Sequence, residues 1–334
     1  MTTLNVAILG LDRAGTSFGL ALKQYAANNG KYTFDITGYD VKSANEKAAQ
    51  KARAIDRIEK SPASAVRDRQ IVLMNMPYDE VRPAYRNFKN DLREGVVILD
   101  ASPLKTPSQQ WAKELLGEDH HVIGFTPLPA ARFLESTGIS AEEASADYFE
   151  GAACLVVPSV DSVTEAVDLA YNTAYLIGAK PRFVDPNDYD NLLALTEQMP
   201  RLLGITLLYN LLQSESWKDL GFFTGSAFAL ATRTLRHEHP DSLREQFYGN
   251  RDVLAQNLDQ MIERMEEVRD VLRSGDKAAL EALLVRSAEG YEKWLNARQS
   301  NDWHKDAQVP REEGTGLLGM FVGGRLAKRI QGKK

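Results

Sequence analysis

Two glycines near the amino terminus have the spacing of a loop that binds a nucleotide phosphate. The segment NVAILGLDRAGTSFGLALK (residues 5–23) passes from an apolar strand through Gly10 into a helix that Gly15 opens. In such a turn, backbone N–H groups and the helix dipole face a pyrophosphate. The spacing is G-x-D-x-x-G, so Asp12 replaces the middle glycine of the usual fingerprint and adds a negative charge near the phosphates. Arg13 could offset that repulsion, or Asp12 could turn away into solvent.

A carboxylate ends the second predicted strand. The segment FDITGYD (residues 34–40) stops at Asp40, where a carboxylate accepts hydrogen bonds from an adenosine ribose and disfavours a 2′-phosphate. Strand, glycine turn, helix, second strand and aspartate occur in order, which predicts NAD binding. The alternative is a nucleotide-binding fold that has lost its ligand. The predicted cofactor-binding residues are Gly10, Leu11, Asp12, Arg13, Ala14, Gly15, Asp40, Met76, Pro77 and Ser102.

Few other side chains are placed for acid–base or nucleophilic chemistry. Lys105 follows the predicted strand VVILDAS (residues 96–102), and a lysine near a bound cofactor could act as an acid or base, or else be solvated or face a phosphate. Cys154 lies in an apolar run, so we expect a buried small hydrophobe and neither a disulfide nor a CxxC metal site. Surface or helix-end positions are expected for the histidines, which are His120, His121, His237, His239 and His304.

The elements that would position these residues follow from the apolar pattern. From residue 4 to about 185, short apolar runs alternate with helix-like segments, which predicts an α/β Rossmann-type domain with a mainly parallel sheet. The strand-like runs then stop. The segments at 191–212 and 251–273 are apolar or amphipathic at helical spacing, which predicts an all-α domain. We therefore expect a dinucleotide-binding domain over residues 1–185, a helical substrate and dimerisation domain over 186–300, and a flexible basic tail over 301–334.

Composition narrows the classes of partner. The chain has 334 residues and is 43% hydrophobic, which is enough for two buried cores. Its formal net charge is −6, whereas binding to nucleic acid or an anionic membrane favours a basic surface. The chain shows no signal-peptide pattern and no stretch near the roughly 18 apolar residues of a membrane span. We expect a cytoplasmic protein that binds small molecules and protein partners.

Five ordered segments resemble the prephenate and arogenate dehydrogenase family of tyrosine biosynthesis, between Asn5 and about Trp294. GLDRAGTSFGLALK is similar to its glycine loop, ILDASPLK to its D-x-x-S-x-K strand end, and VIGFTPLPA to the segment that ends in H-P-M-A-G. NDYDNLLALTEQMPRLL resembles its H-D…A…S-H-L-P-H stretch, and ALATRTLRHEHPDSLREQFYGNRDVL its T-R-I-A…N stretch. The resemblance implies a Rossmann domain, a helical dimerisation domain, and NAD-dependent oxidative decarboxylation of a ring alcohol by a homodimer.

The departures from the family pattern fall at its catalytic positions. Thr126 stands where the family has the histidine that accepts the hydroxyl proton, and a threonine hydroxyl cannot act as a base near pH 7. Ser102 lies one residue early in the strand-end motif, in which Asp100 and Lys105 align. At the positions of three helical-domain histidines the chain has Tyr189, Gln198 and Arg201, and Glu197 replaces a serine.

The resemblance also assigns the substrate-binding arginines. Arg233 matches the arginine that binds the substrate carboxylate, and the family arrangement would place Arg201 and Arg233 facing the nicotinamide, where they suit a small anionic substrate. Alternatively, Arg201 pairs with an acid such as Glu197. The candidate catalytic residues are therefore Ser102, Lys105, Thr126 and Gln198, the candidate substrate-binding residues are Arg201 and Arg233, and no metal is expected.

Three functions stay open at this point. The first is a prephenate- or arogenate-type dehydrogenase with a rearranged proton relay. The second is an oxidoreductase on the same scaffold that acts on another small carbonyl, alcohol or imine acid. The third is a dinucleotide-binding homologue without catalysis.

Overall fold

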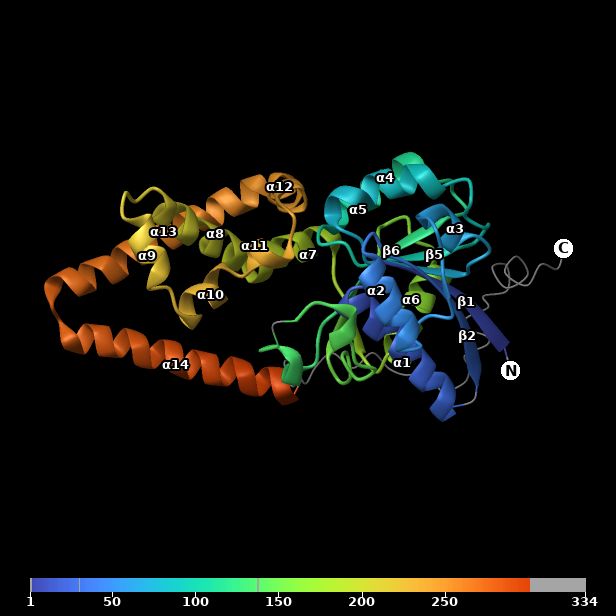
Figure 1. The fold of residues 1–334 in the computed structure, drawn as a ribbon, viewed down its shortest axis with the longest axis horizontal. Coiled ribbons are helices and arrows are strands. Elements are labelled where there is room, and N and C mark those ends of the chain that lie inside the picture. Colours follow the sequence, from blue (N-terminus) through green and yellow to red (C-terminus); the bar gives the residue numbers. More distant parts are fainter. Residues whose placement is uncertain (1, 30, 137, 301–334) are drawn as a thin grey trace. The chain divides into compact units, whose positions relative to one another are not determined.

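A sheet of eight strands forms the centre of the first of two units in the chain (Figure 1). The computed structural model describes residues 2–29, 31–136 and 138–300. Of these described residues, those up to Pro186 and those in 292–300 belong to the first unit, and Asn187–Tyr291 form the second. The tail predicted for residues 301–334 lies outside the described residues.

The strand order confirms the predicted Rossmann-type domain. The order is β3-β2-β1-β4-β5-β6-β7-β8, and all neighbouring pairs are parallel except β6 and β7. The strands are β1 Thr2–Leu9, β2 Tyr32–Tyr39, β3 Arg57–Ile58, β4 Ile71–Met74, β5 Val97–Asp100, β6 His121–Pro127, β7 Ala153–Val157 and β8 Lys180–Phe183. Because β1, β4, β5 and β6 are parallel, their carboxyl ends share one edge of the sheet, where α/β folds bind their ligands.

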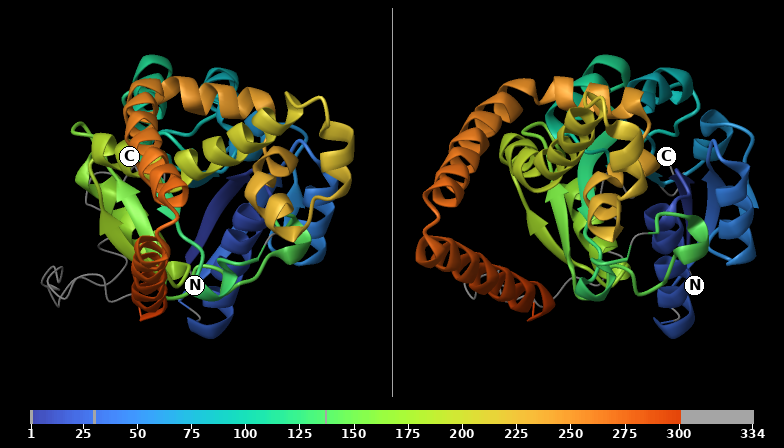
Figure 2. Two further views of the ribbon diagram at one scale, coloured as in Figure 1. Left: turned by 90° about the vertical axis from the view of Figure 1, so that its left-hand side faces the viewer. Right: turned by 60° about the vertical axis from the view of Figure 1, so that its left-hand side comes forward.

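Helices cover both faces of this sheet (Figures 1 and 2). The helices α1 and α6 pack against each other on one side, while α4 packs against α3 and α5 on the other. Their bounds are α1 Arg13–Asn29, α2 Ser43–Lys51, α3 Pro62–Val66, α4 Tyr78–Phe88, α5 Lys105–Leu115 and α6 Thr164–Leu176, with short 3₁₀ turns at Ala131–Phe133 and Ala141–Glu143.

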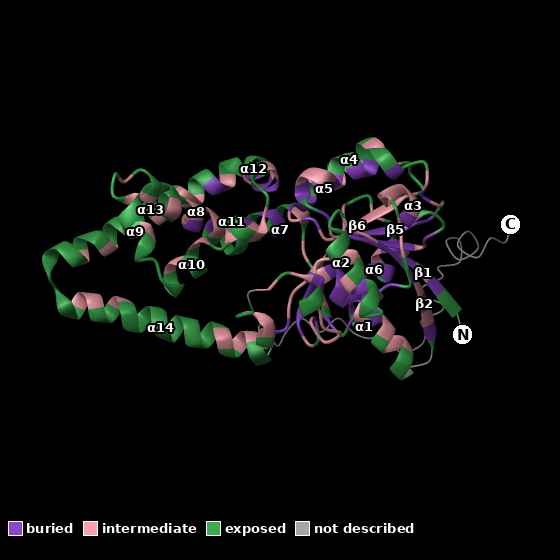
Figure 3. Cartoon of the chain, viewed as in Figure 1, coloured by how far each residue is buried: buried purple, intermediate pink, exposed green. Residues whose placement is uncertain are grey.

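The core of the first unit lies between these layers (Figure 3). The apolar side chains Val6, Ile8 and Leu99 of the central strands are fully buried, as expected for strands covered on both faces. Phe18 of α1 meets Phe125 of β6 edge to face, with ring centroids 6.2 Å apart. This packing fixes α1, and therefore the loop before it, against the sheet.

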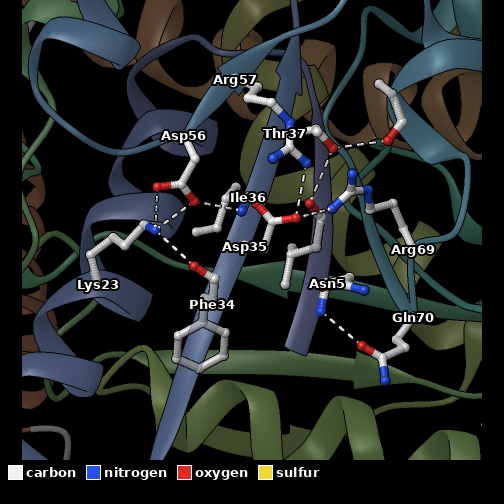
Figure 4. A network of polar contacts seen from close by, with 12 residues as sticks. Asn5, Lys23, Phe34, Asp35, Ile36, Thr37, Asp56, Arg57, Arg69 and Gln70 are labelled. Atoms are coloured by element: carbon white, nitrogen blue, oxygen red, sulfur yellow. Dashed lines mark hydrogen bonds and ion pairs between the residues drawn. The ribbon is translucent and has the colours of Figure 1, made fainter. Parts of the chain in front are cut away.

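Polar contacts tie β2 to its neighbours away from the apolar core (Figure 4). The Lys23 ammonium of α1 donates to the Phe34 carbonyl oxygen over 2.8 Å and pairs with Asp56 at 2.6 Å. Asp35 pairs with Arg69 at 2.8 Å and with Arg57 at 2.9 Å. Burial opposes ionisation of Asp35, but the two arginines outweigh it, so the pKa of this carboxyl is lowered. These pairs help to hold the strand that ends at Asp40.

The second unit is all-α, as predicted. Its elements are α7 Pro186–Leu193, a π-helical turn Ala194–Gln198, α8 Met199–Leu212, α9 Trp217–Phe222, α10 Ser226–Thr232, α11 Thr234–His237, α12 Pro240–Gly249, α13 Arg251–Ser274 and α14 Lys277–Ser300, which continues into the first unit. Its buried apolar cluster is small, with Ala194, Met199 and Leu254 at the centre. Exposed residues run along most of its helices (Figure 3). Several of them are large and apolar, among them Leu207, Phe222 and Phe223.

Candidate functional site

The backbone of the glycine loop between β1 and α1 is packed so closely that it leaves no room for side chains at two positions. Gly10 has a φ of +94°, and a Cβ atom added there would lie 1.9 Å from the carbonyl oxygen of Asn75. A Cβ on Gly15 would lie 1.9 Å from the carbonyl oxygen of Gly10. Both positions therefore require glycine, which is what a tight strand-to-helix turn needs.

Asp12 turns inward and caps α1. Its Oδ1 accepts hydrogen bonds from the backbone N–H groups of Ala14 at 2.9 Å and Gly15 at 3.0 Å, and from Nδ2 of Asn75 at 2.8 Å. Although the residue as a whole is half-buried, protein surrounds its carboxylate, and this burial raises the pKa of Asp12. The sequence leaves two alternatives for Asp12, a charge near the phosphates that Arg13 offsets or a turn into solvent. The carboxylate follows neither of them, because it is bound by its own loop and by Asn75.

Arg13 is buried and points away from the loop. Its guanidinium donates to Oγ of Ser136 at 2.7 Å and to the carbonyl oxygens of Gly138 and Glu143, both at 3.1 Å. The guanidinium carbon lies 4.7 Å from the ring centre of Tyr148 and 5.2 Å from that of Phe133. These partners all belong to the β6–β7 connection, which we define as the described residues 128–136 and 138–152. Arg13 thus fastens this connection to α1.

Asp40 lies beside the loop, as its place at the end of β2 predicts. Its Oδ2 accepts from the backbone N–H of Leu11 at 2.7 Å, and its Oδ1 accepts from that of Lys42 at 2.7 Å. The residue is half-buried, and a carboxylate has further lone pairs for ligand hydroxyls. Two more acids are near it: Glu46 accepts from the Asp40 N–H at 3.2 Å, and burial with the charges of Asp79 and Asp40 raises the pKa of Glu80.

Ser102 and Lys105 lie at the end of β5 but inside the protein. The Lys105 ammonium, in a fully buried side chain, donates to the carbonyl oxygens of Asp100 at 2.7 Å and Ser102 at 2.5 Å. The backbone N–H of Ser102 donates to Oδ1 of Asp100 at 2.8 Å. The Lys105 ammonium and the Asp100 carboxylate hold the turn after β5, so Lys105 is neither solvated nor turned toward a phosphate here. Cys154 is buried as expected, and burial raises the pKa of its thiol.

The remaining first-unit candidates share the same sheet edge. Met76 is buried and Pro77 is exposed, just before α4. Thr126 is half-buried near the end of β6, opposite Leu155 of β7. Since the carboxyl ends of β1, β4, β5 and β6 meet at this edge, the loop, Met76, Ser102 and Thr126 all lie toward the same edge of the sheet.

The second-unit candidates occupy a polar network. Gln198, at the end of the π-helical turn, is fully buried, and its Oε1 accepts from Nδ2 of Asn250 at 3.0 Å. Arg201 pairs with Glu197 at 3.2 Å and with Glu238 at 2.7 Å, which is the alternative left open for it by the sequence. Tyr189 is buried as well.

Arg233 differs from Arg201. It lies between α10 and α11 and is exposed. Among residues 2–29, 31–136 and 138–300, the structure shows no ion pair for its guanidinium. Its charge is therefore available to an anionic ligand.

The two described histidines of the first unit lie away from the carboxyl ends of the β-strands. His120 and His121 lie at the start of β6, and burial lowers the pKa of each. His237 ends α11, and His239 caps α12 by accepting from the Asp241 N–H at 3.3 Å. His304 lies outside the described residues. Within the described part of the chain, no group of three or more His, Cys, Asp or Glu side chains is arranged to hold a metal ion, and no helix is long and apolar enough to cross a bilayer.

Two features of the site were not predicted from the sequence. One is the clasp between Arg13 and the β6–β7 connection, which joins residues about 125 positions apart. The other is the π-helical turn that carries Gln198, a local widening that often marks functional sites. No local sequence signal indicates either feature, because the first depends on tertiary packing and the second on backbone hydrogen bonds that span five residues instead of four.

Two domain models of one protein family match the chain, one in each unit. Residues 18–182 match the prephenate dehydrogenase nucleotide-binding domain, and residues 185–286 match the prephenate dehydrogenase dimerization domain. The first match begins at Phe18, beyond the glycine loop. A cyclohexadienyl dehydrogenase of Zymomonas mobilis is 24% identical over 279 residues, which cover 81% of this chain and 89% of that protein.

Solved structures show the same fold. Prephenate dehydrogenase from Aquifex aeolicus, crystallised with hydroxyphenyl propionate and NAD⁺, is 18% identical with a TM-score of 0.72, over 87% of this chain and 99% of that one. Arogenate dehydrogenase from Synechocystis is 15% identical with a TM-score of 0.63, over 87% and 100% of the two chains.

Proposed function

Since the chain belongs to the prephenate dehydrogenase family, we propose that it is an NAD-dependent dehydrogenase that oxidises prephenate or arogenate with loss of CO₂. The observation that carries this proposal is the presence of both family domains, in order, across residues 18–286. In such a reaction a hydride leaves the ring carbon that bears the hydroxyl, the hydroxyl gives up its proton, and CO₂ departs as the ring becomes aromatic.

The carboxyl edge of the sheet suits a dinucleotide that lacks a 2′-phosphate on its adenosine ribose. NAD, when bound, supplies the hydride acceptor. The Asp40 carboxylate would accept hydrogen bonds from the ribose hydroxyls, and the acids Glu46 and Glu80 near it would repel a 2′-phosphate. The glycine loop has the required backbone shape, although Asp12 already occupies two of its amides.

The chain's own residues would bind and orient an anionic substrate. The exposed guanidinium of Arg233 is the proposed partner of a substrate carboxylate, because charge-assisted pairs of this kind are strong and directional. Arg201 is held by Glu197 and Glu238 and would shape the site more than it neutralises substrate. The four candidate catalytic residues are still proposed to surround the reacting groups, and none of them is a base at neutral pH. They are Ser102, Lys105, Thr126 and Gln198.

A second candidate function rests on that missing base. Thr126 stands at the histidine position, and Gln198 is enclosed by its network. The missing histidine would not impair an oxidoreductase that acts on a different small carbonyl, alcohol or imine acid. We therefore keep it beside the first proposal.

A coupled binding and turnover experiment tests the proposal. We expect the purified protein to reduce NAD when prephenate or arogenate is added. The absorbance of the reduced nicotinamide measures this turnover. Turnover only with members of a panel of 2-oxo and 3-hydroxy acids would support the second candidate. Calorimetry should show tighter binding of NAD than of NADP. A preference for NADP, or no binding of either at millimolar concentration, would contradict the assignment of Asp40.

We also propose that the chain is a homodimer assembled through its helical domain. That domain matches a dimerization domain, and it exposes large apolar side chains, including Phe222 at 85%, Phe223 at 82% and Tyr209 at 64% exposure. Surfaces of this kind are usually covered by a partner. Light scattering at micromolar concentration should give twice the monomer mass, and a monomer there would contradict the proposal.

A further inference from the structure

The amide groups that open α1 are all engaged by the chain itself. A phosphate at a helix N-terminus binds the free N–H groups of the first turn. Here the N–H groups of Ala14 and Gly15 donate to the Asp12 carboxylate at 2.9 and 3.0 Å. That of Arg13 donates to the carbonyl oxygen of Ile139 at 2.8 Å. The first turn therefore offers no free donor to a ligand in this structure.

The β6–β7 connection is held in this place by more than one contact. Beyond the bonds of the Arg13 guanidinium, the backbone N–H of Ser145 donates to Oγ of Ser17 on α1 at 3.0 Å. Ser136, Gly138 and Glu143 supply the oxygens that the guanidinium meets. The connection thus lies on the first turns of α1, and its Ile139 carbonyl cannot leave without disturbing the Arg13 clasp.

The two groups bound to these amides, the Asp12 carboxylate and the Ile139 carbonyl, resemble the phosphate oxygens of a dinucleotide. The Asp12 carboxylate is an anion, and the Ile139 carbonyl is an oxygen acceptor, so together they meet the same donors as two phosphate oxygens would. A pyrophosphate and an ionised Asp12 would also repel each other at this distance.

We propose that the phosphate site at the N-terminus of α1 is self-occupied, so that a dinucleotide binds only when it displaces the Asp12 carboxylate and the Ile139 carbonyl from the amides. This inference rests on the proposed use of NAD. The Arg13 clasp sets how readily the displacement occurs, because the observed affinity falls with the fraction of molecules in the closed arrangement. The loop therefore tunes cofactor affinity in addition to binding the cofactor.

Three variants separate the contributions, with NAD as the probe. Asp12→Gly removes the anion and leaves a residue that is tolerated at an N-cap, so NAD should bind about fivefold more tightly, as expected from removing a partly screened charge repulsion. Asp12→Asn keeps an oxygen that can cap the helix but removes the charge, and its affinity should fall between those of Asp12→Gly and the wild type. Arg13→Ala releases the connection, so NAD should associate faster.

The control is Arg67→Ala, which breaks an exposed ion pair with Asp91 far along the chain from the loop. Its affinity for NAD should equal that of the wild type. Thermal unfolding of each variant checks that the fold persists.

Hydrogen exchange gives a readout that needs neither a variant nor turnover. Adding NAD to the wild-type protein should speed amide exchange in the peptide that spans residues 138–145, since the connection must leave α1. Slower or unchanged exchange there, or equal NAD affinity in folded Asp12→Gly and wild type, would overturn the inference while leaving NAD binding intact. If neither the wild type nor Asp12→Gly bound NAD, the proposed cofactor would be wrong and the inference would fail with it.

Discussion

Replacing Gly10 by alanine is expected to lower the free energy of unfolding by about 3 kcal/mol or more and to abolish nucleotide binding. Two costs add. A residue with a side chain held in the left-handed region is strained by roughly 1–3 kcal/mol. The new Cβ would also lie 1.9 Å from the Asn75 carbonyl oxygen, and relieving such overpacking costs a further 1–3 kcal/mol or so. Urea denaturation measures the sum.

Gly151→Ala is the matched control for this change. Gly151 lies in the same unit, also has a positive φ, of +70°, and has no atom within 4 Å of an added Cβ. It therefore carries the conformational cost without the collision, and it should lose clearly less stability than Gly10→Ala. Equal losses in the two variants would show that the close approach of the loop to Asn75 contributes nothing, which would contradict the packing described for the site.

The framework of the site could be predicted from the sequence because it depends on local pattern. Apolar runs with turns between them indicate parallel strands, and the glycine spacing indicates a strand-to-helix turn. The position of Asp40 follows from these, since a residue that ends a strand next to that turn must lie at the ligand-binding edge.

The direction of individual side chains could not be predicted in the same way. Asp12 has three donors within 3.0 Å, and one of them, Asn75, follows a different strand. For Lys105 the sequence leaves open an acid or base near the cofactor, a solvated lysine and a lysine that faces a phosphate. In the structure its side chain is buried, and its ammonium donates to two carbonyl oxygens in its own turn. In both cases the outcome depends on which buried acceptors or donors lie within reach, and sequence spacing does not contain that information.

Thr126→His is expected to raise the rate of prephenate or arogenate oxidation by up to about 10²–10⁴-fold, which is the usual worth of a positioned general base. The wild-type protein lacks that base, so it should turn over more slowly than a family member with the histidine, by a similar factor. Its rate should climb with pH as hydroxide takes up the proton. The variant should instead show a sigmoid break near about 6.5, where an unperturbed histidine titrates.

The contacts of Lys105 and Gln198 argue against either residue replacing the missing histidine base. Lys105 donates to two carbonyl oxygens from a fully buried position, so it would have to leave both before it could accept a proton. Gln198 is a donor and acceptor within its own network and does not titrate. A wild-type enzyme with fast turnover and a break near 6.5 would contradict this reasoning and point to one of the histidines.

The gain from Thr126→His also depends on productive binding through Arg233. If that exposed guanidinium holds the substrate carboxylate, then adding Arg233→Ala to Thr126→His should abolish the gain, because a base cannot act on a substrate that is not held in place. Arg236→Ala, which removes a neighbouring exposed arginine on α11, is the matched control and should leave the gain intact. Inactivity of the wild type and Thr126→His toward both substrates, with NAD still bound, would instead favour a different substrate on the same scaffold.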